Sequence, residues 1–122
     1  MIGSLLAPFA VWALLHGAML APPQGRSALY FETVKVKTSS QKTCMRFAGD
    51  VSRNEHFANG HASAGEVAGD YGGAYIAITC VDRGGQPAVA VVMSVAPNFT
   101  VARQAGQTIA GRIKVMTCID AC

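Results

Sequence analysis

The chain has 122 residues, of which 51% are apolar and only 14% are charged, so it is too apolar to be disordered and long enough for one domain at most. Its formal net charge is +3, but the ten basic residues are spread along the chain. Because nucleic-acid binding usually needs a clustered basic patch, this distribution argues against a nucleic-acid partner.

The first 25 residues differ from the rest of the chain because they contain no charged side chain. An apolar run over residues 4–15 is followed by small residues and by the helix-breaking sequence PPQG, which is the form of an export signal. The run over residues 2–21 also approaches the length of an uncleaved membrane anchor, and a soluble core helix is a third interpretation. We expect a signal peptide or N-terminal anchor at 1–25, one small domain at 26–122, and a periplasmic or secreted location.

Residues 28–37 alternate in polarity and predict a strand with Val34 and Val36 on its inner face. Residues 38–55 predict a helix, because three consecutive hydroxyl side chains can accept the unpaired N–H groups of its first turn. Asn59-Gly60 is a turn signal after this helix. Four apolar residues form the stripe that would face the core: Cys44, Phe47, Ala48 and Val51.

Six glycines lie between Gly65 and Gly85, and we interpret them as turns of a hairpin. A phosphate-binding loop would need the spacing GxGxxG before a helix or the sequence GK[ST], and neither occurs here. The glycines separate a weak strand over 62–69 from a clear one over 74–81. On the second strand Ile76, Ile78 and Cys80 share one face, and Tyr75, Ala77 and Thr79 share the other.

Residues 88–96 predict the strongest strand of the chain. We expect its bulkier face to point into the core: Val89, Val91, Met93 and Val95. The open face of the sheet would then carry milder side chains from two strands: Tyr75, Ala77 and Thr79, with Ala88, Ala90 and Val92. Such a surface predicts weak homodimerisation or the binding of a partner.

Residues 97–116 predict a second helix that is capped by Asn98 or Thr100. The apolar stripe of this helix comprises Ala102, Ala105, Ile109, Ile113 and Met116, whereas Gly106 and Gly111 weaken it. The resulting order β-α-β-β-β-α predicts an α+β two-layer sandwich. Its antiparallel sheet would have about four strands, with both helices on one face.

Four cysteines in a small exported chain indicate a disulfide framework, which allows three pairings. Cys44 lies on the stripe of the first helix, and Cys80 lies on the strand face of Ile76 and Ile78. If that helix packs on that face, the two sulfurs meet, and we predict a structural Cys44–Cys80 disulfide, with two buried free thiols as the alternative. Cys118 and Cys122 could bond to each other, stay free or reach another chain.

Few residues indicate chemistry. Ser52, Ser63 and Ser94 lack a nucleophile elbow, and the carboxylates Glu66 with Asp70 and Asp50 with Glu55 are typical of solvated surfaces. A copper site could use His56 and His61 with Met45 and Met93, because these ligands suit Cu(I). We expect no catalytic residue, no cofactor and no bound metal.

The stretches TCMRFAGDV, GEVAGDYGGAYIAITCV and PAVAVVMSVAPNFTVA together resemble small exported bacterial proteins of unknown function. The residues that carry the resemblance are Cys44, Gly65, Gly69 and Cys80. It implies an architecture and an exported bacterial setting, with no activity to transfer. We therefore expect a non-enzymatic binding module of the bacterial envelope whose partner is a protein or an envelope component, in contact with the membrane only through an uncleaved N-terminal segment. The alternative is a small envelope enzyme or copper carrier that uses His56 and His61.

Overall fold

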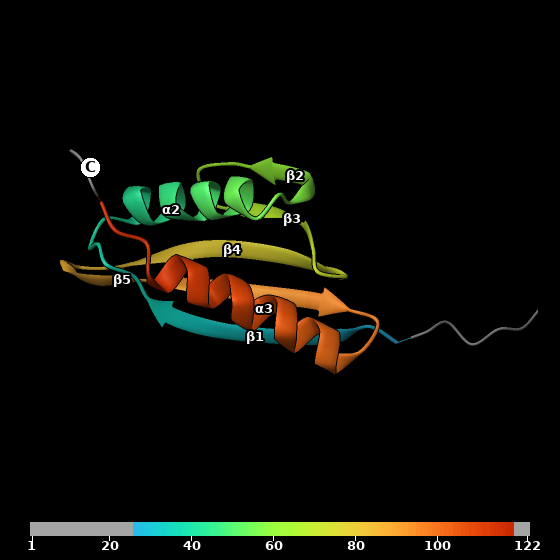
Figure 1. Ribbon diagram of the computed structural model, residues 1–122. Coiled ribbons are helices and arrows are strands. Elements are labelled where there is room, and N and C mark those ends of the chain that lie inside the picture. The colour runs from blue at the N-terminus through green and yellow to red at the C-terminus, as the bar shows by residue number, and fades with distance from the viewer. Residues whose placement is uncertain (1–25, 119–122) are drawn as a thin grey trace, which may run out of the picture.

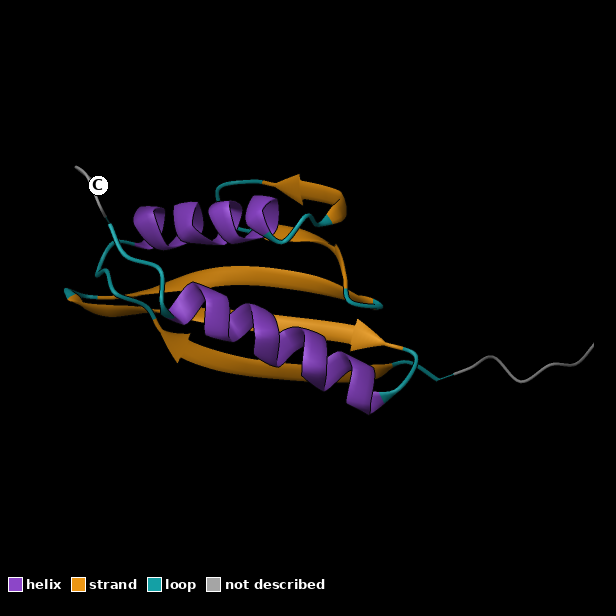
Figure 2. Ribbon diagram, viewed as in Figure 1, coloured by secondary structure: helices purple, strands orange, loops and turns teal. Residues whose placement is uncertain are grey.

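The computed structural model describes residues 26–118, which form an α+β fold around a five-stranded antiparallel sheet (Figure 1, Figure 2). The strands lie in the order β1-β5-β4-β3-β2, so the first and last strands of the chain are neighbours. The segment predicted as a signal peptide or anchor, residues 1–25, lies outside the described residues. In chain order the elements are β1 (Ala28–Lys35), α2 (Gln41–Asn54), β2 (Ala58–Ala62), β3 (Val67–Tyr71), β4 (Ala74–Arg83), β5 (Gln86–Ala96) and α3 (Phe99–Lys114).

The fifth strand is a correction to the expected count of about four. Asn59 and Gly60 were predicted to form a turn, but they lie inside β2. Between the pairs Ala58–Asp70 and His61–Ala68, β2 advances by one residue more than β3, and Asn59 has a φ of +50°. A bulge inserts one extra residue in this way and tolerates a left-handed backbone conformation. The turn signal is therefore absorbed as a bulge in an edge strand.

The other turns and both helix starts are confirmed. Gly72-Gly73 and Gly84-Gly85, all at positive φ, join β3 to β4 and β4 to β5, so the glycine-rich stretch is a set of strand connections. The Ser40 hydroxyl caps α2 by accepting the Thr43 N–H at 3.1 Å, and the Asn98 side chain caps α3 by accepting the Val101 N–H at 3.0 Å. Within residues 26–118, neither helix combines the length and the apolar character that crossing a membrane requires.

The two helices contact side chains that share one face of the sheet, which we call the covered face. The α2 helix lies beside β3 and β4, whereas α3 lies across β1 and β5 (Figure 1). Strand pairing places Ile78 beside Val92 and Ile76 beside Ser94 on this face. The predicted stripe of α2 is buried here, as are Ala102, Ala105, Ile109 and Ile113 of α3, and Met116 is half-buried beyond the end of that helix.

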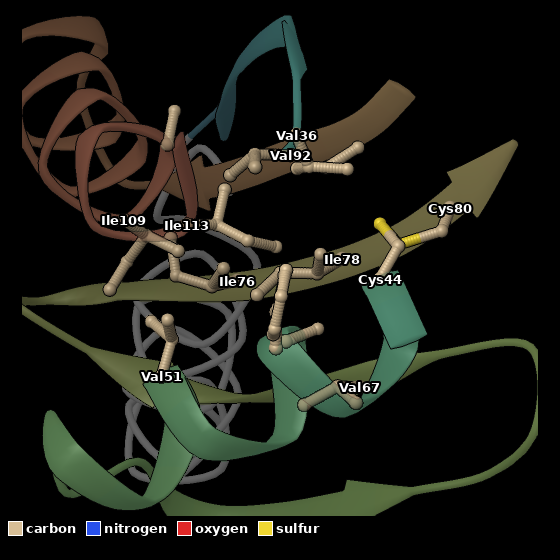
Figure 3. Close-up of a cluster of buried hydrophobic side chains, with 14 of the residues drawn as sticks. Val36, Cys44, Val51, Val67, Ile76, Ile78, Cys80, Val92, Ile109 and Ile113 are labelled. Atoms are coloured by element: carbon tan, nitrogen blue, oxygen red, sulfur yellow. A yellow bond between two sulfur atoms is a disulfide. The ribbon is translucent and has the colours of Figure 1, made fainter. Parts of the chain in front are cut away.

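The predicted disulfide between Cys44 and Cys80 is confirmed (Figure 3). It joins the first turn of α2 to the C-terminal half of β4, with a Cα–Cα distance of 6.1 Å and a sequence separation of 36 residues. Cys44 is fully buried and Cys80 nearly so, so the bond lies in the core beside Ile78. The docking of helix on strand that predicted this bond is therefore correct.

The faces of β5 are the reverse of our expectation. Ala88, Ala90, Val92, Ser94 and Ala96 are buried on the covered face, whereas Met93 and Val95 are exposed on the opposite face. The reason is the close approach of α3. A Cβ atom added to Gly106 would lie 2.7 Å from Tyr30 Cδ1 and 3.2 Å from Ser94 Cβ, so the helix backbone leaves no room for large side chains beneath it.

Tyr30 of β1 fills the space beside Gly106. Its ring packs against Phe99 with an edge-on geometry at 6.1 Å between centroids, and its hydroxyl donates to Glu32 Oε1 at 2.9 Å. Desolvation raises the pKa of the Tyr30 phenol above its ordinary value, and the hydrogen bond to Glu32 acts in the same direction. The side chain therefore joins β1 to the first half of α3 in its neutral form.

Candidate functional site

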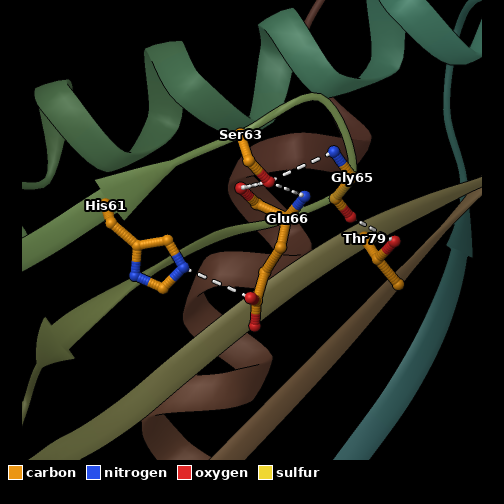
Figure 4. A network of polar contacts seen from close by, with 5 residues as sticks. All are labelled: His61, Ser63, Gly65, Glu66 and Thr79. Carbon is orange, nitrogen blue, oxygen red and sulfur yellow. Dashed lines mark hydrogen bonds and ion pairs between the residues drawn. The ribbon is translucent and has the colours of Figure 1, made fainter.

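The histidine that the sequence singled out with His56, His61, belongs to a hydrogen-bonded turn between β2 and β3 (Figure 4). Its Nε2 lies 3.2 Å from Glu66 Oε2. The Ser63 hydroxyl accepts the Glu66 N–H at 3.1 Å, and the Thr79 hydroxyl donates to the Gly65 carbonyl at 2.7 Å. These contacts satisfy the backbone of a tight connection, which accounts for the polar cluster without catalysis.

The other titratable and nucleophilic candidates are also engaged in local structure. The Ser52 hydroxyl donates to the Gly49 carbonyl at 2.7 Å, and Ser94 is fully buried beneath α3. Asp50 forms an ion pair with Arg53 one helical turn later, and Glu55 Oε1 lies 2.9 Å from Arg112 Nε. Neither histidine contacts a serine among the described residues. The sequence candidates for nucleophile, base and acid are thus not brought together.

The four residues considered for copper are separated by the sheet. Met45 is buried in α2 on the covered side, whereas Met93 lies on the opposite face. His56 ends α2 with a φ of +57°, and His61 is held by Glu66. Over residues 26–118 no three His, Cys, Asp or Glu side chains form a group that could hold a metal ion. This part of the chain does not assemble the predicted ligand set.

Two hollows lie on the helical side of the molecule, and each has a volume of about 240 Å³. One is lined by Ser40, Lys42, Thr43 and Arg46 at the start of α2, and the other lies near His61 and Phe57. Ordinary small-molecule sites enclose about 300–1,000 Å³ and are mostly apolar. The two hollows are therefore small for a ligand-binding site.

The strongest candidate site is the face of the sheet opposite the helices, which we call the open face. Its side chains come from alternate positions of β1, β5 and β4, and strand pairing arranges them in rows. One row is Leu29, Val95 and Tyr75, and the next is Phe31, Met93 and Ala77. Five of these six side chains, all except Ala77, are between 37% and 64% exposed. A contiguous patch of large exposed apolar side chains is typical of an interaction site.

The composition of the open face supports a protein contact. Phe31, Tyr75 and Met93 belong to the residue types that are enriched in protein interfaces, whereas the centre of the face contains no charge. Farther along the strands, Val89 and Val91 are half-buried, and Val81 is exposed. The apolar surface thus extends along three adjacent strands.

Charged residues lie only at the two lateral edges of the open face, and their signs differ. Lys35 is exposed at the end of β1, which is the outer strand on one side. Asp70 is exposed on β3 toward the other side, and Glu66 lies immediately before that strand. Asp70 also accepts a hydrogen bond from the Asn59 side chain at 3.0 Å. The face is therefore basic at one edge, apolar at the centre and acidic at the other edge.

Sequence reasoning identified only part of this face. Tyr75, Ala77 and Thr79 were placed on it correctly, but Ala88, Ala90 and Val92 were wrong because they lie beneath the helices. Leu29, Phe31, Met93 and Val95 were missed. The alternation of β1 carried the signal for two of them, since Val34 and Val36 had already been placed on its inner face.

No protein-family model, no curated protein and no solved structure matches this chain. Its function must therefore be inferred from its own residues and geometry.

Proposed function

We propose that this protein is a non-enzymatic interaction module, exported to the bacterial envelope or beyond, which docks a partner protein through the open face. In this proposal the described residues are a two-layer sandwich. The helices and the covered face form the stable core, and the open face is the working surface. The observation that carries the proposal is the contiguous exposure of Leu29, Phe31, Tyr75, Met93 and Val95.

Export is supported by the buried Cys44–Cys80 disulfide, because such bonds form and persist in oxidising compartments and are rare in the cytosol. The charge-free residues 1–25 support the same setting. A reporter that is active only outside the cytoplasm, fused after residue 30, tests this part. Activity is expected, and an inactive fusion that is nevertheless produced would contradict export.

The docking role is tested by a photo-reactive amino acid at position 31 of the full chain in cells. Covalent adducts to a protein are expected from position 31 after illumination. The matched control is position 115, because the Val115 side chain is 63% exposed, nearly the same as the 64% of Phe31, but it lies at the C-terminal end of α3. If both positions give the same weak background, the open face is not a docking surface.

A further inference from the structure

We propose that the open face pairs with the open face of a second copy of this chain, so that two sheets pack face to face around a two-fold axis parallel to the strands. This inference rests on the proposed docking role and adds the identity of the partner. Three features of the described residues support it: the extent of the face, the distribution of its charges and the chemistry of its centre.

The extent of the face suits a weak dimer. Four strands spaced about 4.8 Å apart, each about eight residues long at about 3.3 Å per residue, cover about 500 Å² in projection. Two such faces bury about 1,000 Å², to which the relief of the side chains adds. A specific interface needs about 1,000 Å² or more in total. The open face therefore lies at the lower limit for a stable pair, which predicts a dimer that dissociates on dilution.

The charge distribution is complementary to itself. A two-fold axis parallel to the strands places β1 of each copy over β3 of the other. Lys35 of one copy then lies over the edge that carries Glu66 in its partner, and symmetry repeats this contact. Strand pairing puts Lys35 in the row of Val81 and Glu66 beside Thr79, which is one row away, or about 7 Å along the strand. A lysine side chain can span such an offset.

The centre of the face fits a packed sheet pair. Facing sheets lie about 10 Å apart, and their side chains interdigitate. Phe31, Met93 and Tyr75 are large enough to fill that space, whereas Ala77 between them leaves room for a side chain from the opposite sheet. An anionic lipid surface fits less well, because Glu66 and Asp70 would face the headgroups.

The first test resolves the adducts from position 31 by mass. A product with twice the mass of the chain is expected. An adduct with a different protein would overturn the second copy as partner and leave the docking role standing. An internal adduct onto residues 1–25, a lipid adduct or no adduct would overturn both proposals.

The second test measures dimerisation of the purified full chain by sedimentation. Phe31→Asp is expected to weaken the dimer at least tenfold, because it places a charge at the apolar centre, whereas Val115→Asp leaves dimerisation unchanged. Melting curves show whether each variant is folded. A wild-type chain that sediments as a monomer at its highest soluble concentration would overturn the inference.

Charge reversal tests the proposed axis. Lys35→Glu and Glu66→Lys are each expected to weaken the dimer up to about fivefold, the range of an exposed ion pair. The double variant Lys35→Glu/Glu66→Lys should restore wild-type affinity, because both contacts are re-formed with inverted sign. Additive losses in the double variant would exclude this arrangement of the two sheets.

Discussion

The two faces of β5 are similar in apolar content and opposite in environment. On the covered face, small side chains lie beneath α3 and are fully or almost fully buried. On the open face, Val89, Val91, Met93 and Val95 provide more apolar surface and keep much of it exposed. The difference shows that the bulk of a strand face does not decide which side is buried. The distance at which a helix can pack decides it, and Gly106 of α3 sets that distance here.

The largest effect on the covered side should come from removing the disulfide. The double variant Cys44→Ala/Cys80→Ala is expected to lose about 3–4 kcal/mol of unfolding free energy, since the bond closes a long loop in the unfolded chain. Thermal or urea unfolding measures the loss. Reductant should bring the wild type close to the variant and change the variant little. A loss below about 1 kcal/mol would mean that the packing of α2 on β4 stabilises the fold without the bond.

A matched pair of valines tests the contrast between the faces directly. Val92→Ala should cost about 2–3 kcal/mol, because it opens a cavity beside Ile78 in the covered core. Val95→Ala, three residues away on the same strand, should change stability by less than about 0.5 kcal/mol, because its side chain is exposed. Urea unfolding of both variants, at concentrations where the chain is monomeric, gives the comparison. Equal losses would refute the distinction between the faces.

The close approach of α3 is tested by two glycines of the same helix. Gly106→Ala is expected to destabilise the protein by about 1–2 kcal/mol, because the new methyl group overlaps the Tyr30 ring and this cost exceeds the gain in helix propensity. Gly111→Ala meets no atom within 4 Å and should stabilise by up to about 1 kcal/mol. The opposite signs are the critical result. Stabilisation by both substitutions would show that α3 can shift away from β1.

The smallest effect is expected at Ser94. Its Oγ is buried and has no hydrogen-bond partner within residues 26–118, so Ser94→Ala removes an unsatisfied polar group. The substitution should be neutral or stabilising by up to about 1 kcal/mol. Ser40→Ala is the control, because its hydroxyl caps α2 and its loss should cost about 1 kcal/mol. A clear loss at Ser94 would indicate a hydrogen bond that α3 provides in solution.

The sequence alone determined the local structure of most of the described chain. Ser40 and Asn98 cap the helices because their side chains accept N–H groups that no preceding turn can reach, and this depends only on neighbouring residues. The paired glycines mark turns because they adopt positive φ without strain. The Cys44–Cys80 bond was also accessible, since both cysteines lie on apolar faces with unambiguous periodicity.

The tertiary structure alone decided which face of β5 is buried and whether Asn59-Gly60 forms a turn or a bulge. Both outcomes depend on residues distant in the sequence. Gly106 of α3 selects the small face of β5 by steric contact, and pairing with β3 draws Asn59 and Gly60 into β2. The open face follows from the same contacts, because a strand pattern with two apolar faces does not indicate which one a helix can approach. Only the packed position of α3 leaves Phe31, Met93 and Val95 exposed.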